Sequence, residues 1–305
     1  MKKLPSLLPF LAGWILLAST ESLQTQSLVN GGLQMALFLL VVCIPTWRTG
    51  RMSYVDIGWP WGLVVIAGVT FFLSDGNPTR LAMVSGVYCL VGARMGIFAL
   101  KLWRRGVFER EFPRYRYQEI RWTRAGITNF PLARQIEVLT QGLANASFLA
   151  MPAFLVTINP TPSIHWLEAL GFAVALTALV LESVADAQKA RFVAQSKRAG
   201  ERNRVCQVGL WRYSRHPNYF FEWMVWNGLV VMALPALPHL FEVEPTLVAA
   251  LLTVGLFFVP RLMYLTLVYF TGAKPSEYYS AQKRPDYVEY QRTTRQFFPG
   301  PRRTG

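Results

Sequence analysis

Charged residues are scarce in this sequence, and cysteine and histidine are scarcer still. Of the 305 residues, 16% are charged, three are cysteine and three are histidine, whereas 52% are hydrophobic. Cys43, Cys89 and Cys206 show no paired spacing, so the sequence predicts neither a disulfide framework nor a zinc site, and we expect no bound metal. So few charges in a chain of this length are typical of a protein whose solvent is mostly lipid.

Several common cofactor and catalytic motifs are also absent. The sequence contains no GxGxxG, no GxxxxGK[ST], no HExxH and no CxxC. A Rossmann domain, a P-loop nucleotide hydrolase and a zinc protease of the HExxH type are therefore not predicted. Any nucleotide must be bound by other means.

Eight apolar segments are long enough, or nearly so, to cross a bilayer, whose core of roughly 30 Å needs about 20 helical residues. They cover approximately residues 5–20, 28–46, 57–73, 81–101, 138–157, 164–184, 219–238 and 247–270. The first is short, and Pro235 and Pro238 interrupt the seventh. The first also resembles a secretory signal peptide, whose removal would leave seven helices. The sequence thus predicts one all-α membrane domain over residues 1–305, a polytopic bundle of about eight transmembrane helices.

Basic residues occur in alternate loops. Almost all Lys and Arg residues fall in the N-terminus and in 47–56, 102–137, 185–218 and 271–305, and none falls in 21–27, 74–79, 158–163 or 239–246. Because cytoplasmic loops retain Lys and Arg, this pattern predicts that both chain ends are cytoplasmic. The net charge of +14 then suits membrane lipids with anionic headgroups, and we expect no nucleic-acid partner.

A polar cluster in residues 209–223 runs directly into the seventh apolar segment. Pro217 suits the first turn of a helix, where its missing N–H needs no partner. The free amides of that turn, together with Arg212, Arg215 and His216, would form an anion site at the membrane surface. An interfacial belt of aromatic and basic residues is the alternative interpretation.

The same helix carries polar side chains one turn into the bilayer. Asn218, Tyr219 and Glu222 share a face by their spacing of three and four residues. Because a carboxylate at that depth is costly, Glu222 is a functional candidate, and we expect Asn218 and Glu222 to face the bundle interior.

A second polar stripe ends the sixth apolar segment, where Glu182, Asp186 and Lys189 recur at i, i+4 and i+7. The stripe suits ligand binding or, equally, an ion-pair face that leaves the membrane. A loop at 196–208 follows it and carries Arg204 among four basic residues, which suits phosphates or lipid headgroups.

These residues carry a resemblance to a known superfamily. Its patterns are Ala-Asp186-Ala-Gln188, Asn203 to Trp211, Ser214-Arg-His-Pro-Asn-Tyr219 and Glu222-Trp223, with weaker likeness at Ser53 to Trp59 and from Glu277 to Pro299. The sequence resembles the steroid 5α-reductase C-terminal (sterol reductase) superfamily, and within it the DUF1295 family of bacterial membrane proteins. The resemblance implies a bacterial inner-membrane protein with its cofactor site on the cytoplasmic side.

The resemblance also implies a bound dinucleotide, NADPH or NADH. In the related sterol reductases its contacts would fall here on Lys189, Trp211, Asn218, Tyr219 and Tyr290, with acidic contacts at Asp186 and Glu222 and a basic loop contact at Arg204. With Arg215 and His216 of the anion site, these form the expected cofactor-binding set. The sequence departs from the sterol reductases at two positions. At Val193 they carry Arg, so the choice between NADPH and NADH stays open; at Phe221 they carry Gly.

The chemistry that the resemblance implies is hydride transfer to an activated C=C of an apolar, steroid-like, isoprenoid or lipid substrate. Residues 131–305 would form the cofactor-binding half and residues 1–130 the substrate side. Such an alkene needs a polarising or proton-donating group, for which the suitable residues are Asp56 and Tyr88, with Tyr54 and Tyr115 as further candidates. For each, an interface anchor or core aromatic is the alternative.

Two other functions are compatible with the sequence. The Arg-His-Pro-x-Tyr pattern also occurs in membrane methyltransferases of the isoprenylcysteine and phospholipid type, which use S-adenosylmethionine. A non-enzymatic lipid-binding membrane protein is the third possibility.

The C-terminal tail, in which four tyrosines alternate with basic residues, is too aromatic for a simple disordered end, and we expect it to fold back over the helix ends. A basic tail lying on anionic lipid is the alternative.

Overall fold

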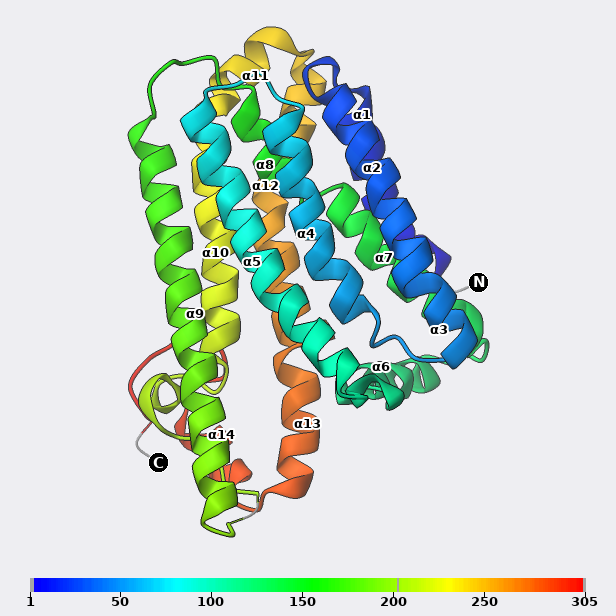
Figure 1. Cartoon of the computed structure of the whole chain (residues 1–305), viewed down its shortest axis with the longest axis vertical. Helices are drawn as coiled ribbons and strands as arrows, with labels where there is room; N and C mark the ends of the chain where they lie inside the picture. The colour runs from blue at the N-terminus through cyan, green and yellow to red at the C-terminus, as the bar shows by residue number, and fades with distance from the viewer. Residues whose placement is uncertain (1–2, 202, 304–305) are drawn as a thin grey trace. The chain divides into compact units, whose positions relative to one another are not determined.

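The computed structural model describes residues 3–201 and 203–303, and these are helical or irregular without any β-strand. Seven helices or helix pairs in this part are long and apolar enough to cross a membrane: 21–49, 55–72, 78–104, 130–157, 166–198, 217–243 and 246–283. An eighth apolar helix, Leu4–Ser19, is shorter. The predicted class, an all-α polytopic membrane bundle, is confirmed (Figure 1).

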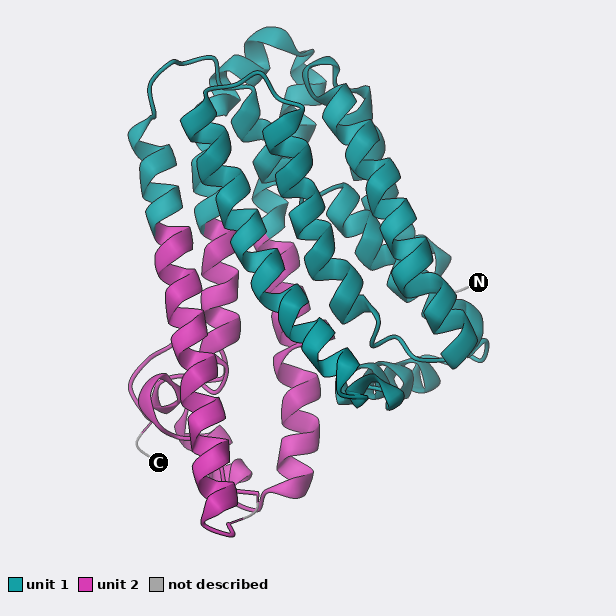
Figure 2. Cartoon of the chain, viewed as in Figure 1, with its two compact units in different colours: residues 1–173, 228–259 teal, residues 174–227, 260–305 magenta. Residues whose placement is uncertain are grey.

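The helices form two compact units (Figure 2). Unit 1 comprises residues 1–173 and 228–259, and unit 2 comprises residues 174–227 and 260–305. The expected boundary near residue 130 lies inside unit 1. All of the residues expected to bind the dinucleotide lie in unit 2, whereas the catalytic candidates Asp56 and Tyr88 lie in unit 1.

Most helices belong to a single unit. Unit 1 contains α1 (Leu8–Ser19), α2 (Gln24–Phe38), α3 (Ile44–Thr49), α4 (Val55–Phe72), α5 (Pro78–Arg104), α6 (Pro113–Arg124), α7 (Phe130–Ala146), α8 (Met151–Thr157) and α11 (Leu237–Val243). Unit 2 contains α13 (Ala273–Lys283) and α14 (Tyr287–Thr293). Three further helices contribute residues to both units: α9 (Trp166–Arg198), α10 (Pro217–Ala233) and α12 (Thr246–Leu265). The interruption expected at Pro235 is present, because a 3-10 turn at Leu234–Ala236 separates α10 from α11.

An asparagine cap with a proline in the first turn begins two of the helices in unit 1. The Asn77 side chain accepts hydrogen bonds from the backbone N–H groups of Thr79 (2.9 Å) and Arg80 (3.1 Å) at the start of α5. Asn129 accepts one from Leu132 (3.1 Å) at the start of α7. A side-chain oxygen at this position satisfies amides that have no partner within the helix, so the sequence itself fixes where these helices begin.

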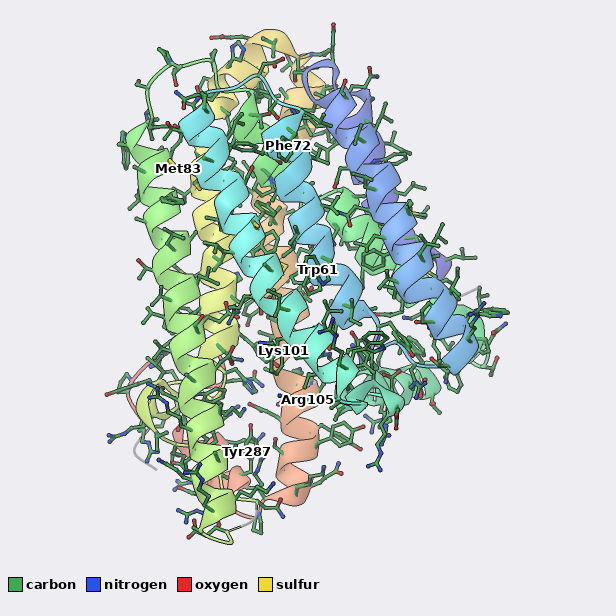
Figure 3. The ribbon with its side chains drawn as sticks, in the orientation of Figure 1. Trp61, Phe72, Met83, Lys101, Arg105 and Tyr287 are labelled. Carbon is green, nitrogen blue, oxygen red and sulfur yellow. The ribbon has the colours of Figure 1, made fainter. Side chains whose placement is uncertain are left out.

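Small residues let α4 and α5 approach closely. A Cβ atom at Gly92 would lie 2.5 Å from the carbonyl oxygen of Pro60, and one at Gly96 would lie 2.8 Å from Nε1 of Trp61. Trp61 projects from α4 beside α5 (Figure 3). Close backbone approach of this kind is how membrane helices gain packing contacts where lipid gives no hydrophobic drive.

The segment 138–157, expected as one continuous span, is broken. Helix α7 ends at Ala146, the backbone at Ser147 takes φ −117° and ψ −103°, and α8 begins at Met151. Side chains satisfy carbonyl groups near the break: Asn30 donates to the Asn145 oxygen (3.2 Å) and Tyr88 to the Leu149 oxygen (2.6 Å). A helix break within a membrane is stable only with such partners.

The loops that carry Lys and Arg and the loops that lack them lie at opposite ends of unit 1. A cavity of about 730 Å³ at one end is lined mainly by residues of the loops that lack Lys and Arg: 21–22, 25–26, 73–78, 157–162, 239 and 243. At the other end Lys3 pairs with Glu137 and Arg114 pairs with Asp56, so the N-terminus and two basic loops lie together. Figure 3 shows Phe72 and Met83 near the first end and Lys101 and Arg105 near the second.

We expect the basic end to face the cytoplasm, which accessibility of introduced cysteines would check. In a variant without native cysteines, Arg116→Cys should react with a membrane-impermeant maleimide only after the cells are opened, and Asp75→Cys should react in intact cells. Both positions are exposed. Labelling of Arg116→Cys in intact cells would contradict the orientation.

Candidate functional site

The loop that follows α9 in unit 2 is tied back to that helix by Gln188. The Leu210 N–H donates to Oε1 of Gln188 at 2.9 Å. The neighbouring Gly209 has φ +55°, and a Cβ there would lie 2.4 Å from the Gln188 side chain. Only glycine fits this position without strain, so the Gln188–Gly209 contact sets the path of the loop.

Trp211 and Lys189, expected together from the resemblance, lie against each other. Trp211 is 2% exposed, and its indole N–H donates to the Ala185 carbonyl oxygen at 2.8 Å. The Lys189 ammonium nitrogen lies 4.1 Å from the centre of the indole ring. The ring face attracts the cation, and the buried indole therefore fixes the position of the Lys189 charge.

Asp186 and Asn218 also meet, although 32 residues separate them in the sequence. The Asn218 amide donates to Oδ1 of Asp186 at 3.1 Å. The amide oxygen of Asn218 is buried and finds no hydrogen-bond partner among the described residues. One turn further along α10, Glu222 is buried, so it faces protein rather than lipid, as expected. The Asn218 amide oxygen, which has no donor, is suited to accept a hydrogen bond from a ligand hydroxyl or amide.

Arg215 was expected to contact an anion, but its guanidinium is surrounded by protein acceptors. It donates to both carboxylate oxygens of Glu277, at 2.7 and 3.1 Å, and to the carbonyl oxygens of Gln291 (2.9 Å) and Thr294. Both partners of the ion pair are less than a tenth exposed. Arg215 therefore joins the start of α10 to α13 and to the C-terminal segment.

His216 belongs to the same network. Its Nε2 lies 3.1 Å from Glu277, and its ring stacks on Tyr219 with the planes 3° apart. Burial lowers the pKa of His216 below its ordinary value of 6.5, although hydrogen bonding to Glu277 opposes the shift. His216 is thus neutral at pH 7, and it lies between the Tyr219 ring, on which it stacks, and the Glu277 carboxylate.

The C-terminal tail folds back over this loop, as expected. Tyr290 is 2% exposed, and its hydroxyl donates to the carbonyl oxygens of Trp211 (2.5 Å) and Ser214 (3.3 Å). Further along the tail, the Gly300 N–H donates to the Tyr213 oxygen at 3.1 Å. Burial raises the pKa of Tyr290, which keeps its hydroxyl protonated as a donor. Tyr290 therefore supports the backbone beneath Trp211.

Arg204, the expected basic loop contact, forms a surface ion pair. Its guanidinium lies 2.7 Å from the Glu201 carboxylate, and both side chains are about half exposed, at 53% and 46%. Such a pair is weak and readily exchanged, so Arg204 is free to turn to another anion.

The catalytic candidates of unit 1 are engaged with protein groups. Asp56 pairs with Arg114 and accepts a hydrogen bond from the Tyr115 hydroxyl at 2.8 Å. Burial raises the pKa of Tyr115 to about 12, which keeps that hydroxyl protonated. Tyr88 is 1% exposed and bonded to the carbonyl oxygen of Leu149. Their catalytic roles remain predictions.

Three features of the molecule had no role in the sequence prediction. They are the partnership of Arg215 with Glu277, a second buried ion pair between Arg80 and Glu168, and a cluster of fully buried amides, Asn30, Gln34 and Asn145. The spacing of Asn30 and Gln34 by four residues within an apolar segment was the available signal for the amide cluster.

These features define a polytopic α-helical membrane protein with a cluster of buried polar side chains where α9 and α10 meet the C-terminal tail. More particularly, the chain belongs to the DUF1295 family: a family described as "Protein of unknown function (DUF1295)" matches residues 42–294. Comparison with curated proteins and with solved structures finds no match.

Proposed function

We propose that the protein is a membrane-embedded NAD(P)H-dependent reductase of an apolar substrate with an activated C=C, and that unit 2 binds the dinucleotide. The observation that supports this most is the meeting of Asp186, Lys189, Trp211 and Asn218. These are four of the residues that the resemblance to sterol reductases assigns to the cofactor, and they come from two helices and the loop between them.

The chemical character of these groups fits a dinucleotide. Lys189 offers a cation without an ion-pair partner among the described residues, and Asn218 offers an unsatisfied amide oxygen for a ribose hydroxyl or a carboxamide. A bound nicotinamide supplies the hydride, and saturation of a C=C also requires one proton. Trp211 and Tyr290 then act as supports: the indole fixes Lys189, and the tyrosine fixes the backbone of Trp211.

The motif shared with methyltransferases does not discriminate between the two chemistries. Arg215 and His216, which carry that motif, are bonded to Glu277 and to the tail. A structural role of this kind serves a methyltransferase as well as a reductase. The choice therefore depends on which cofactor the Asp186–Asn218 cluster binds.

Titration of NADPH, NADH and S-adenosylmethionine into the purified protein in one detergent tests this proposal. We expect a reduced dinucleotide to bind and Asn218→Ala to weaken it about ten- to a hundredfold, because one ligand hydrogen bond contributes about 1–3 kcal/mol. Asn227→Ala is the matched control: Asn227 lies on the same helix, and its amide donates within α10 to the Trp223 oxygen at 2.7 Å. Calorimetry of the three proteins gives the affinities.

A chain truncated before Lys274 provides a second variant, because it lacks both Glu277 and Tyr290 and should lose the site. Binding of S-adenosylmethionine but of neither dinucleotide would replace the reductase proposal by the methyltransferase. Binding of none of the three would favour a lipid-binding protein. Equal dinucleotide affinities for wild type, Asn218→Ala and the truncated chain would place the cofactor outside unit 2.

A further inference from the structure

The cavity of about 730 Å³ in unit 1 is large enough for a small-molecule ligand, since ligand pockets measure roughly 300–1,000 Å³. Its walls come from the two ends of loops 21–26 and 73–78, from 157–162 and from helix α11. All of these segments belong to one compact unit. None of the residues assigned above to the dinucleotide or to catalysis lines the cavity, so its contents are a separate question.

Two polar side chains in the cavity wall have hydrogen-bonding capacity that the protein does not use. Gln26 is 6% exposed, and its amide donates to Oγ1 of Thr157 at 3.3 Å. The single hydroxyl hydrogen of Thr157 goes to the Phe154 carbonyl oxygen at 2.7 Å, because Oε1 of Gln26 is farther away, at 3.5 Å. The Gln26 oxygen is thus left without a donor, and the buried Oγ of Ser74 has no partner in the described part of the chain. Buried acceptors of this kind are suited to the N–H or O–H groups of a ligand.

The carboxylates at this end of unit 1 lack counter-charges. Glu21 and Asp75 line the cavity, and neither forms an ion pair within residues 3–201 and 203–303. Glu244 is 9% exposed, and its Oε1 accepts a hydrogen bond at 2.9 Å from the backbone N–H of Ser22, which also lines the cavity. Among the described residues Glu244 has no cationic partner either. A carboxylate buried to this extent is costly without a positive charge nearby.

The protein offers no cation of its own to the cavity. The loops at this end contain no Lys or Arg. Arg80, at the start of α5, is fully buried and paired with Glu168. The ring of His239, which lines the cavity, has Nδ1 3.1 Å from the exposed Glu242 carboxylate. The positive charge must therefore come with the ligand.

We propose that this cavity binds a small organic cation, an ammonium compound that carries further N–H or O–H donors, as a polyamine does. Its charge is attracted by Glu21 and Asp75, and its donors find the unused oxygens of Gln26 and Ser74. Because this end lacks Lys and Arg, we expect it to face away from the cytoplasm, so the ligand enters from outside. The inference does not depend on the proposed reductase activity.

Spermidine is the probe, because its amines are protonated at neutral pH, and triethylene glycol is an uncharged control ligand. We expect spermidine to bind the full-length protein in an uncharged maltoside detergent, although the net charge of +14 repels cations elsewhere on the molecule. Asp75→Asn should weaken binding about tenfold through loss of a charge-assisted contact, and Asp75→Glu should retain most of the affinity. Asp286→Asn is the matched control, since Asp286 is an exposed aspartate of unit 2.

Gln26→Leu distinguishes the cavity from the exposed carboxylates at its rim. Removal of the buried oxygen should weaken spermidine about tenfold, and Gln26→Glu, which keeps an acceptor there, should bind more tightly than Gln26→Leu. Calorimetric titration of all the variants gives the affinities. Wild-type affinity in Gln26→Leu would reject the cavity as the location of the ligand. Wild-type affinity in Asp75→Asn, equal binding of triethylene glycol, or no binding of spermidine to wild type would reject a cation site.

Discussion

Glu277→Gln should destabilise the protein by roughly 3–5 kcal/mol, because it leaves the Arg215 guanidinium buried without its counter-charge. Arg215 is 9% exposed and its side chain is held by Glu277, Gln291 and Thr294, so it cannot reach water without opening the tail. The midpoint of thermal unfolding in a single detergent should fall by on the order of 10 °C. Limited proteolysis should also cut the tail of the variant at 287–303 before the rest of unit 2.

The matched control for this prediction is Glu289→Gln in the same tail. Glu289 pairs with Arg292 on the surface, where the two side chains are 60% and 59% exposed. Solvent screens such a pair, so its loss should leave the unfolding midpoint and the proteolysis pattern unchanged. Equal behaviour of the two variants would mean that the Arg215–Glu277 pair does not hold the tail.

The class of fold was predictable because it depends on local composition. A stretch of apolar residues must be helical in lipid whatever surrounds it, since every backbone group needs a partner inside the segment. Alternate loops with and without Lys and Arg then placed Lys3, Arg51 and Arg114 at one end of unit 1, where contacts to Glu137, the Glu109 carbonyl and Asp56 bring them together.

Features that depend on distant partners were not predictable. The break at Ser147 has no proline or glycine in residues 144–150 to mark it, and it exists because Asn30 and Tyr88, from other helices, satisfy the carbonyls beside it. The amides of Gln34 and Asn145 show the same dependence. Gln34 donates to the Gly62 oxygen at 2.8 Å, and Asn145 donates to the Trp59 oxygen at 3.0 Å.

Some contacts of the candidate site were likewise predictable from the sequence, and others were not. The meeting of Asp186 with Asn218 and of Lys189 with Trp211 followed from the resemblance in residues 182–223. The inward orientation of Arg215 did not, because a basic residue before a helix start reads equally as an anion ligand or as half of an ion pair. Its partner, Glu277, lies 62 residues away, and no local pattern connects them.

The pattern of basic loops did not explain Arg80. This basic residue lies at the end of unit 1 where the loops contain no other Lys or Arg. The structure pairs it with Glu168 at 2.6 Å, and the two side chains are 0% and 1% exposed. The guanidinium also donates to the carbonyl oxygens of Asn159 (3.1 Å), Thr161 (3.1 Å) and Ser163 (2.9 Å). Arg80 therefore holds the connection between α8 and α9 onto the start of α5.

Glu168→Gln should accordingly lower the stability of the protein by roughly 3–5 kcal/mol, since a fully buried guanidinium would lose its carboxylate partner while remaining charged. The control is Glu242→Gln at the same end of unit 1, where Glu242 is 72% exposed and pairs weakly with His239. Removing both charges, in Arg80→Met with Glu168→Leu, should cost less than the sum of the two single changes by at least about 1 kcal/mol, because neither partner is then left unpaired. Thermal unfolding of these five variants, the single changes Arg80→Met and Glu168→Leu included, and of wild type in one detergent gives the comparison. Additive costs for the two single changes would show that Arg80 is stabilised by the loop carbonyls rather than by Glu168.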